Sequence, residues 1–170
     1  MKTIKKALII LLIGASSSIL AENIYIDGSV QSRCSIFTDT AGTYGNPSAF
    51  KLSTTPSDGG QVPVIRYDVS LASAYYANIA TPISFSSSPA LTDSTVFTGA
   101  VTVTQTSSSD MSGYQAASTT PTSNSRQYGL TVAGSTWFNA TSEVLYGGGN
   151  QTPFPSGDYR SIVVASCIPM

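Results

Sequence analysis

Histidine is absent from this 170-residue sequence, and its absence removes several kinds of chemistry at once. A Ser-His-Asp triad, a histidine metal cluster and the usual proton shuttle at neutral pH all need an imidazole. The carboxylates are scattered, and most of them stand beside turn residues, as Asp58, Asp93, Asp110 and Asp158 do. They form no recognisable catalytic pair. We therefore expect a protein that is not an enzyme and that holds no cofactor or metal.

Charged residues are also scarce, at 10% of the chain. Three of the lysines fall within the first six residues, so the chain beyond Ala21 has five cations against nine carboxylates and a net charge of about −4. It lacks the basic patch that a nucleic-acid partner would need. The glycines at 147–149 are not followed by the Lys-Ser/Thr of a phosphate-binding loop, and we interpret them as a turn.

Residues 1–21 have the pattern of a signal peptide, with a basic start, an apolar run over 7–13 and a small residue, Ala21, at the end. No segment reaches the roughly 20 apolar residues of a membrane-spanning helix. We expect export through the periplasm and no membrane span. Cys34 and Cys167 both lie in the exported part, where a structural disulfide is more common than a reactive thiol. The sequence leaves open whether they pair within one chain.

An alternation of apolar and polar residues predicts β-strands through the rest of the chain. It is clearest at Ile65, Tyr67 and Val69, which alternate with polar residues. Similar but weaker patterns occupy 49–53, 79–86, 97–104, 128–132, 136–146 and 159–167, with Gly, Pro, Ser and Asp between them. No apolar stripe with helical spacing is present. Seven or eight short strands in one domain predict an all-β sandwich or barrel.

The first strand after the leader, 22–30, raises the main question about function. Ile24, Ile26 and Val30 share one face, Gly28 fills the step between them, and the other face is polar. A strand with one apolar face needs a groove to fill. That groove can lie in its own domain or in another copy of the chain.

Four segments, in order and spacing, resemble the major pilins of colonisation-factor fimbriae, the alternate chaperone–usher family typified by the CFA/I subunit. They are Glu-Asn-Ile-Tyr-Ile with Gly-Ser-Val at 22–30, Asn-Pro-Ser-Ala-Phe-Lys-Leu at 46–52, Pro-Ala-Leu-Thr-Asp at 89–93 and Pro-Ser-Gly-Asp-Tyr at 155–159. The resemblance covers nearly all of 22–170. It departs from the family in two respects: typical major subunits lack a cysteine pair, and the proline that follows their donor strand is Ser32 here.

The resemblance implies an incomplete immunoglobulin-like β-sandwich over 34–170 that lacks its final strand. The N-terminal extension 22–33 of the next subunit would complete it as a donor strand, inserting Ile24, Ile26, Gly28 and Val30. The closing strand would form one wall of the acceptor groove through Tyr159, Ser161, Val163 and Ala165. In such a sandwich Cys34 and Cys167 could meet at one end of this groove.

The function that this implies is a structural subunit of a cell-surface fimbria that attaches to host cells. The expected partners are identical pilin subunits, a periplasmic chaperone, an outer-membrane usher and a tip adhesin. One alternative is a self-complete secreted carbohydrate-binding β-sandwich, in which 24–30 is a strand of its own domain. Others are a minor or tip-associated pilin and a secreted hydrolase, the last opposed by the missing histidine.

Overall fold

The computed structural model describes residues 33–70, 74–147 and 152–170. Those ranges contain nine strands and two short 3-10 helices, and every strand pair is antiparallel, so the predicted all-β class is confirmed. The strands are β1 (Arg33–Thr40), β2 (Gly45–Ser48), β3 (Lys51–Ser53), β4 (Val64–Ser70), β5 (Tyr75–Ala80), β6 (Thr95–Thr106), β7 (Ser125–Leu130), β8 (Gly134–Tyr146) and β9 (Val164–Pro169). The 3-10 helices are η1 (Pro56–Asp58) and η2 (Ser109–Met111). The predicted inserting residues Ile24, Ile26, Gly28 and Val30 lie outside these ranges.

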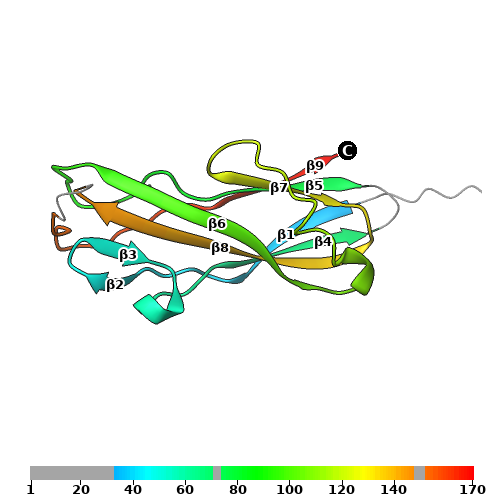
Figure 1. Cartoon of the computed structure of the whole chain (residues 1–170), viewed down its shortest axis with the longest axis horizontal. Coiled ribbons are helices and arrows are strands. Elements are labelled where there is room, and N and C mark those ends of the chain that lie inside the picture. Colours follow the sequence, from blue (N-terminus) through cyan, green and yellow to red (C-terminus); the bar gives the residue numbers. More distant parts are fainter. Residues whose placement is uncertain (1–32, 71–73, 148–151) are drawn as a thin grey trace, which may run out of the picture.

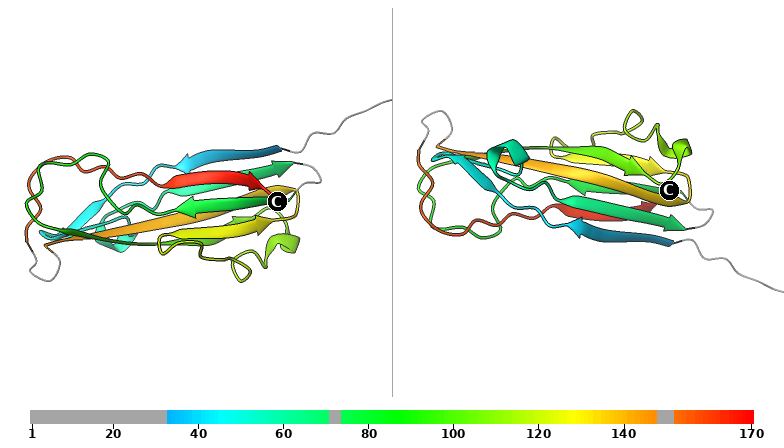
Figure 2. Two further views of the ribbon diagram at one scale, coloured as in Figure 1. Left: turned by 90° about the horizontal axis from the view of Figure 1, so that it is seen from above. Right: turned by 90° about the horizontal axis from the view of Figure 1, so that it is seen from below.

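The strands form two layers of unequal size (Figures 1 and 2). The large sheet has the order β1-β4-β8-β3-β2, with β6 also paired to β8. The small sheet has the order β7-β5-β9. The long strand β8 is central to the large sheet, because β6 pairs along one of its edges while β4 and β3 share the other.

Alternation in the sequence accounts for the buried faces of both central strands. In β4, Ile65, Tyr67 and Val69 are buried, as their spacing predicts. In β8 every second residue from Thr136 to Tyr146 is buried. Before β4, η1 is capped at its C-terminal end by Gly59, whose φ of 78° lies in the left-handed region that glycine tolerates.

The core between the layers is built around Phe138, which is fully buried. Its ring lies 5.4 Å from that of Tyr67 and 4.7 Å from that of Tyr128. The Tyr67 hydroxyl of the large sheet donates to the Ser166 carbonyl of the small sheet at 3.2 Å. In the opposite direction, the Tyr128 hydroxyl donates to the Val101 carbonyl at 2.8 Å. Burial raises the pKa of both hydroxyls, so they remain neutral donors that tie the layers together.

Two strands differ in position from the sequence prediction. The strand expected over 79–86 is β5, which begins four residues earlier, at Tyr75, and ends at Ala80, because Pro82 has no N–H to donate to a ladder. The closing strand expected over 159–167 begins only at Val164. Before it, Arg160 pairs with Ser87 in a single bridge, and within the part of the chain that is described the segment 161–163 has no ladder partner.

We expect Phe138→Ala to lower the free energy of unfolding by roughly 3–5 kcal/mol, because it leaves a cavity between two buried tyrosines. Urea unfolding followed by intrinsic fluorescence measures this change. Val96→Ala is the control, since Val96 is 47% exposed on β6 and its truncation should change stability by less than about 0.5 kcal/mol. Equal losses for the two variants would contradict this account of the core.

Candidate functional site

Both sheets end on the same side of the molecule in a strand with one free edge. β1 is the last strand of the large sheet and β9 is the last strand of the small one. Among the described ranges, no further strand pairs with the outer edge of either. A groove of about 610 Å³ opens on this side, and its wall includes the four residues predicted for it: Tyr159, Ser161, Val163 and Ala165. Their role as acceptors of a strand remains a prediction.

The opposite side of the sandwich is covered by the connection between β6 and β7. The Gln115 side chain accepts the backbone N–H of Val103 in β6 at 2.8 Å. Thr119 in the connection and Gln127 in β7 exchange two backbone hydrogen bonds of 2.9 Å. Some edge groups on that side therefore have partners from within the chain. On the side between β1 and β9, no strand in the described ranges pairs with either outer edge.

The half of the groove between Ile36 on β1 and Ala165 on β9 is mainly apolar. Ile65 and Ala140 form its buried floor. Ile36 on β1 lines the groove yet is 37% exposed, and Val163 and Ala165 on the opposite wall are only half-buried. A ligand that covers partly exposed apolar walls is stabilised by the removal of that apolar surface from water.

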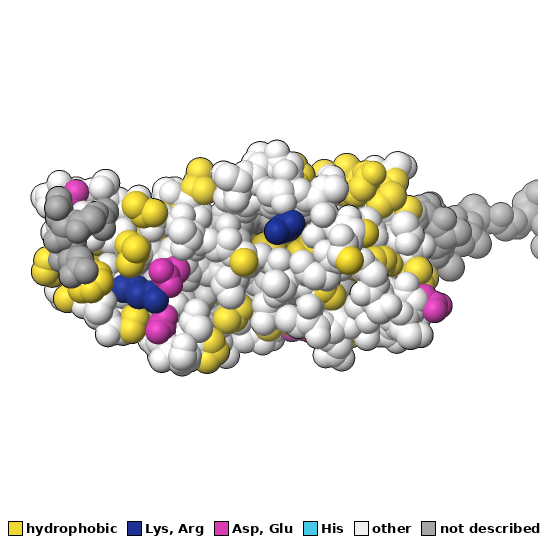
Figure 3. Space-filling model, in the orientation of Figure 1, with side chains coloured by type: hydrophobic (Ala, Val, Ile, Leu, Met, Phe, Trp, Pro, Cys, Tyr) yellow, Lys and Arg dark blue, Asp and Glu magenta, His cyan; other side chains and the backbone are white. Residues whose placement is uncertain are grey.

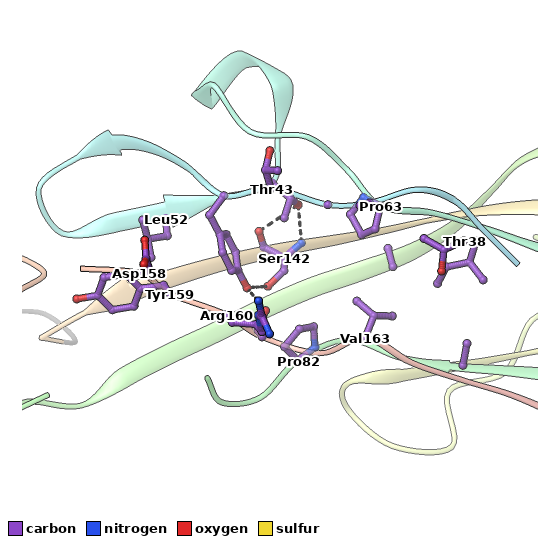
Figure 4. Close-up of a pocket in the computed structure, with 18 of the residues that line it drawn as sticks. Thr38, Thr43, Leu52, Pro63, Pro82, Ser142, Asp158, Tyr159, Arg160 and Val163 are labelled. Atoms are coloured by element: carbon purple, nitrogen blue, oxygen red, sulfur yellow. Dashed lines mark hydrogen bonds between the residues drawn. The ribbon is translucent and has the colours of Figure 1, made fainter. Parts of the chain in front are cut away.

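A polar crossing divides the groove near its middle, where Figure 4 shows Ser142. The Tyr44 hydroxyl lies 2.9 Å from Ser142 Oγ on the floor and 2.6 Å from Ser161 Oγ on the opposite wall. Beyond this point Leu52, Asp158 and Tyr159 lie at the far end, while Arg160 lies beside the crossing (Figure 4). The far end of the groove therefore combines polar side chains with Leu52.

A disulfide between Cys34 and Cys167 joins the two edge strands at the apolar end. Their Cα atoms are 6.3 Å apart, and the bond connects residues separated by 133 positions. The predicted disulfide is confirmed, and it forms within one chain. Cys34 and Ile36 share a face of β1, while Val163, Ala165 and Cys167 share a face of the opposite wall.

Most residues that line this groove were not predicted from the sequence, Tyr44 and Ile36 among them. Tyr44 lies between Gly42 and Gly45, where no strand pattern assigns it a place in the site. Ile36 could have been found from its spacing, since it stands two residues after Cys34 and shares its strand face. Nothing local in the sequence indicates that Tyr44 would meet Ser161, which lies 117 positions away.

The short strand β3 lies beside the groove, and its residue Leu52 lines it. Ion pairs of the neighbouring residue Lys51 hold this strand in place. Lys51 Nζ lies 2.8 Å from Glu143 Oε2 and 3.1 Å from Asp58 Oδ2. A hydrogen bond from Ser53, and then the one from Lys51, hold the pKa of Asp58 below its ordinary value. Hydrogen bonds to Glu143 and Asp58 raise the pKa of Lys51.

These pKa directions predict a loss of stability in acid. A carboxylate with a lowered pKa stabilises the fold above its ordinary pKa of about 4, and this contribution disappears as the pH falls through the folded value. The contribution of Lys51 persists through neutral pH and is lost only as the pH rises beyond about 10.5. We expect the urea midpoint to fall between pH 6 and pH 3, and Asp58→Asn to reduce that fall.

Asp110→Asn is the control for this experiment, because Asp110 forms no ion pair with any residue in the described ranges. If both variants reduce the acid loss equally, the ion cluster around Lys51 is not its source.

Other kinds of site were sought within the same ranges. They contain no group of three or more His, Cys, Asp or Glu side chains placed to hold a metal ion. None of their helices is both long and apolar enough to cross a membrane. The groove between β1 and β9 is thus the candidate site that the structure offers.

Comparison of the chain with models of known protein families, with curated proteins and with solved structures found no match. The case for a function therefore rests on the groove and on the sequence.

We expect replacement of both cysteines by serine to lower the free energy of unfolding by up to about 4–5 kcal/mol, because the closed loop is long. Thermal unfolding of the oxidised protein and of the Cys34→Ser/Cys167→Ser variant compares the two. Mass spectrometry of the unreduced protein is the companion measurement. Two free thiols, or a linkage between chains, would contradict the intramolecular bond.

Proposed function

We propose that this chain is a structural subunit of a surface fimbria, non-enzymatic, in which residues 22–30 of one copy fill the groove of the next. The observation that carries the proposal is the groove itself, bounded by the free edges of β1 and β9. An added strand would pair with both edges through its backbone, while its apolar face would cover the groove floor. A fibre would then grow one copy at a time.

Strand order supports an immunoglobulin-like sandwich that lacks one strand. The immunoglobulin fold places its strands A, B, E and D in one sheet and C, F and G in the other. In such a sandwich β1, β4, β8 and β6 would correspond to A, B, E and D, and β5 and β9 to C and F, while β7 beside β5 would be an addition. The G strand would then lie beside β9, along the groove.

The N-terminal segment suits this vacancy chemically. Ile24, Ile26 and Val30 repeat every second residue, so an extended strand would present all three to the groove. Burying each would contribute roughly 1.5–3 kcal/mol. At the disulfide end, the groove is lined by the apolar side chains of Ile36, Val163 and Ala165.

Geometry favours insertion into another copy over insertion into the same copy. To fill its own groove, the segment would have to reverse direction just before Arg33, at Gln31-Ser32. Two-residue reversals favour Asn-Gly, Asp-Gly or a glycine at the first position, and neither glutamine nor serine suits them. The segment of a second copy needs no such reversal to enter the groove.

Exposed sheet edges explain the other partners that we propose. Before assembly, the edges of β1 and β9 form an aggregation hazard that must be covered. A periplasmic chaperone would cover them, an outer-membrane usher would exchange the chaperone for the next subunit, and a tip adhesin would end the fibre. The assembled fimbrium would then support attachment to host cells.

We expect Ile26→Asp to abolish fibre assembly, because it would place a charge against the apolar groove at a cost of several kcal/mol. Electron microscopy of the surface of cells that express the chain together with its chaperone and usher measures this. Ser29→Asp is the matched control, since the same charge falls on the polar face of the segment and should leave fibres intact.

Fibres of normal length from the Ile26→Asp variant would refute the proposal. A wild-type chain that purifies as a discrete folded monomer without any chaperone would favour the self-complete carbohydrate-binding module instead.

A further inference from the structure

The strand that receives tension from the N-terminal segment is held weakly by its own contacts. β1 begins at Arg33, directly after that segment, and within the described ranges it pairs along one edge only, with β4. On its outer face Arg66 of β4 lies 4.7 Å from the Phe37 ring and 3.2 Å from Asp39 Oδ1. Partly exposed contacts of this kind contribute little. Pulled from its start, β1 would be the first strand to peel away.

The disulfide changes the path that tension takes. Cys34 is the second residue of β1, and its bond leads to Cys167 in β9, near the other end of the described chain. The shortest covalent route from Arg33 to Met170 therefore passes through Cys34 and the four residues 167–170, and omits everything from 35 to 166. The core, including Phe138, lies outside this route.

The same bond joins the two walls of the groove. On the proposed function, an inserted strand from another copy is bonded to β1 and β9, and the pull of the subunit's own N-terminal segment arrives at β1. Both pulling forces would therefore act on β1 and β9, the two strands that the Cys34–Cys167 bond joins.

We infer that Cys34–Cys167 is a cross-link under tension: it carries the pull of the N-terminal segment directly to the groove wall, so that the segment between the cysteines is not extended when a fibre is stretched. This role rests on the proposed fibre, but it differs from a gain in stability. A merely stabilising bond raises the force at which a domain opens. A bond on the load path also removes the length that opening can release.

Stretching single fibres with an atomic force microscope separates these roles. Oxidised fibres should extend without long steps. Fibres reduced with a thiol after assembly, or built from the Cys34→Ser/Cys167→Ser variant, should lengthen in steps of up to about 480 Å, since 133 positions separate the cysteines and each residue extends by at most about 3.6 Å.

Phe138→Ala is the matched control, because it weakens the core while leaving the disulfide in place. Fibres of this variant should still show no long step. Long steps from oxidised wild-type or Phe138→Ala fibres would overturn the inference, as would their absence after reduction.

If the wild-type chain forms no fibres, the proposed function fails instead, and the cross-link is tested by pulling the single full chain from its two ends. Oxidised chains that release the length of 35–166 under this pull would overturn the inference in that case too.

Discussion

The arrangement on which the rest of this structure depends is that both sheets stop, on the same side, at a strand with a free edge. β1 and β9 face each other there, and Cys34–Cys167 ties them at one end. The opposite side is covered by the chain between β6 and β7 (Figure 2). Free strand edges of this kind are templates for pairing with another strand.

The buried core and the partly exposed groove walls lie in different parts of the molecule. Phe138 and the hydrogen bonds of Tyr67 and Tyr128 hold the sheets together beneath the groove. Above them, Ile36 and Val163 remain partly exposed. The surface carries few charges (Figure 3), so hydrophobic burial and backbone pairing dominate what an inserted strand can gain. The core beneath the groove is buried within the single chain, whereas the groove walls are partly exposed.

The spacing and type of residues along the sequence predicted part of the fold. The alternation at Ile65, Tyr67 and Val69 predicted the buried face of β4, and the expectation of export together with two cysteines predicted the disulfide. Contacts between distant residues could not be predicted in this way. β9 starts only at Val164 because its ladder partner β5 ends opposite, at Ala80, and the place of Tyr44 depends on Ser161 across the groove. Neither pairing leaves a periodic trace in the sequence.

Hydrogen exchange of the backbone amides of β1 and β9 tests the central claim most directly, because an added strand must bond to their free edges. The full chain is compared with and without a synthetic peptide of residues 22–32. We expect amides within Arg33–Thr40 and Val164–Pro169 to exchange more slowly when the peptide is present, while those of β6 and β7 stay unchanged. Unchanged exchange at β1 and β9, or protection confined to β6 and β7, would contradict the account.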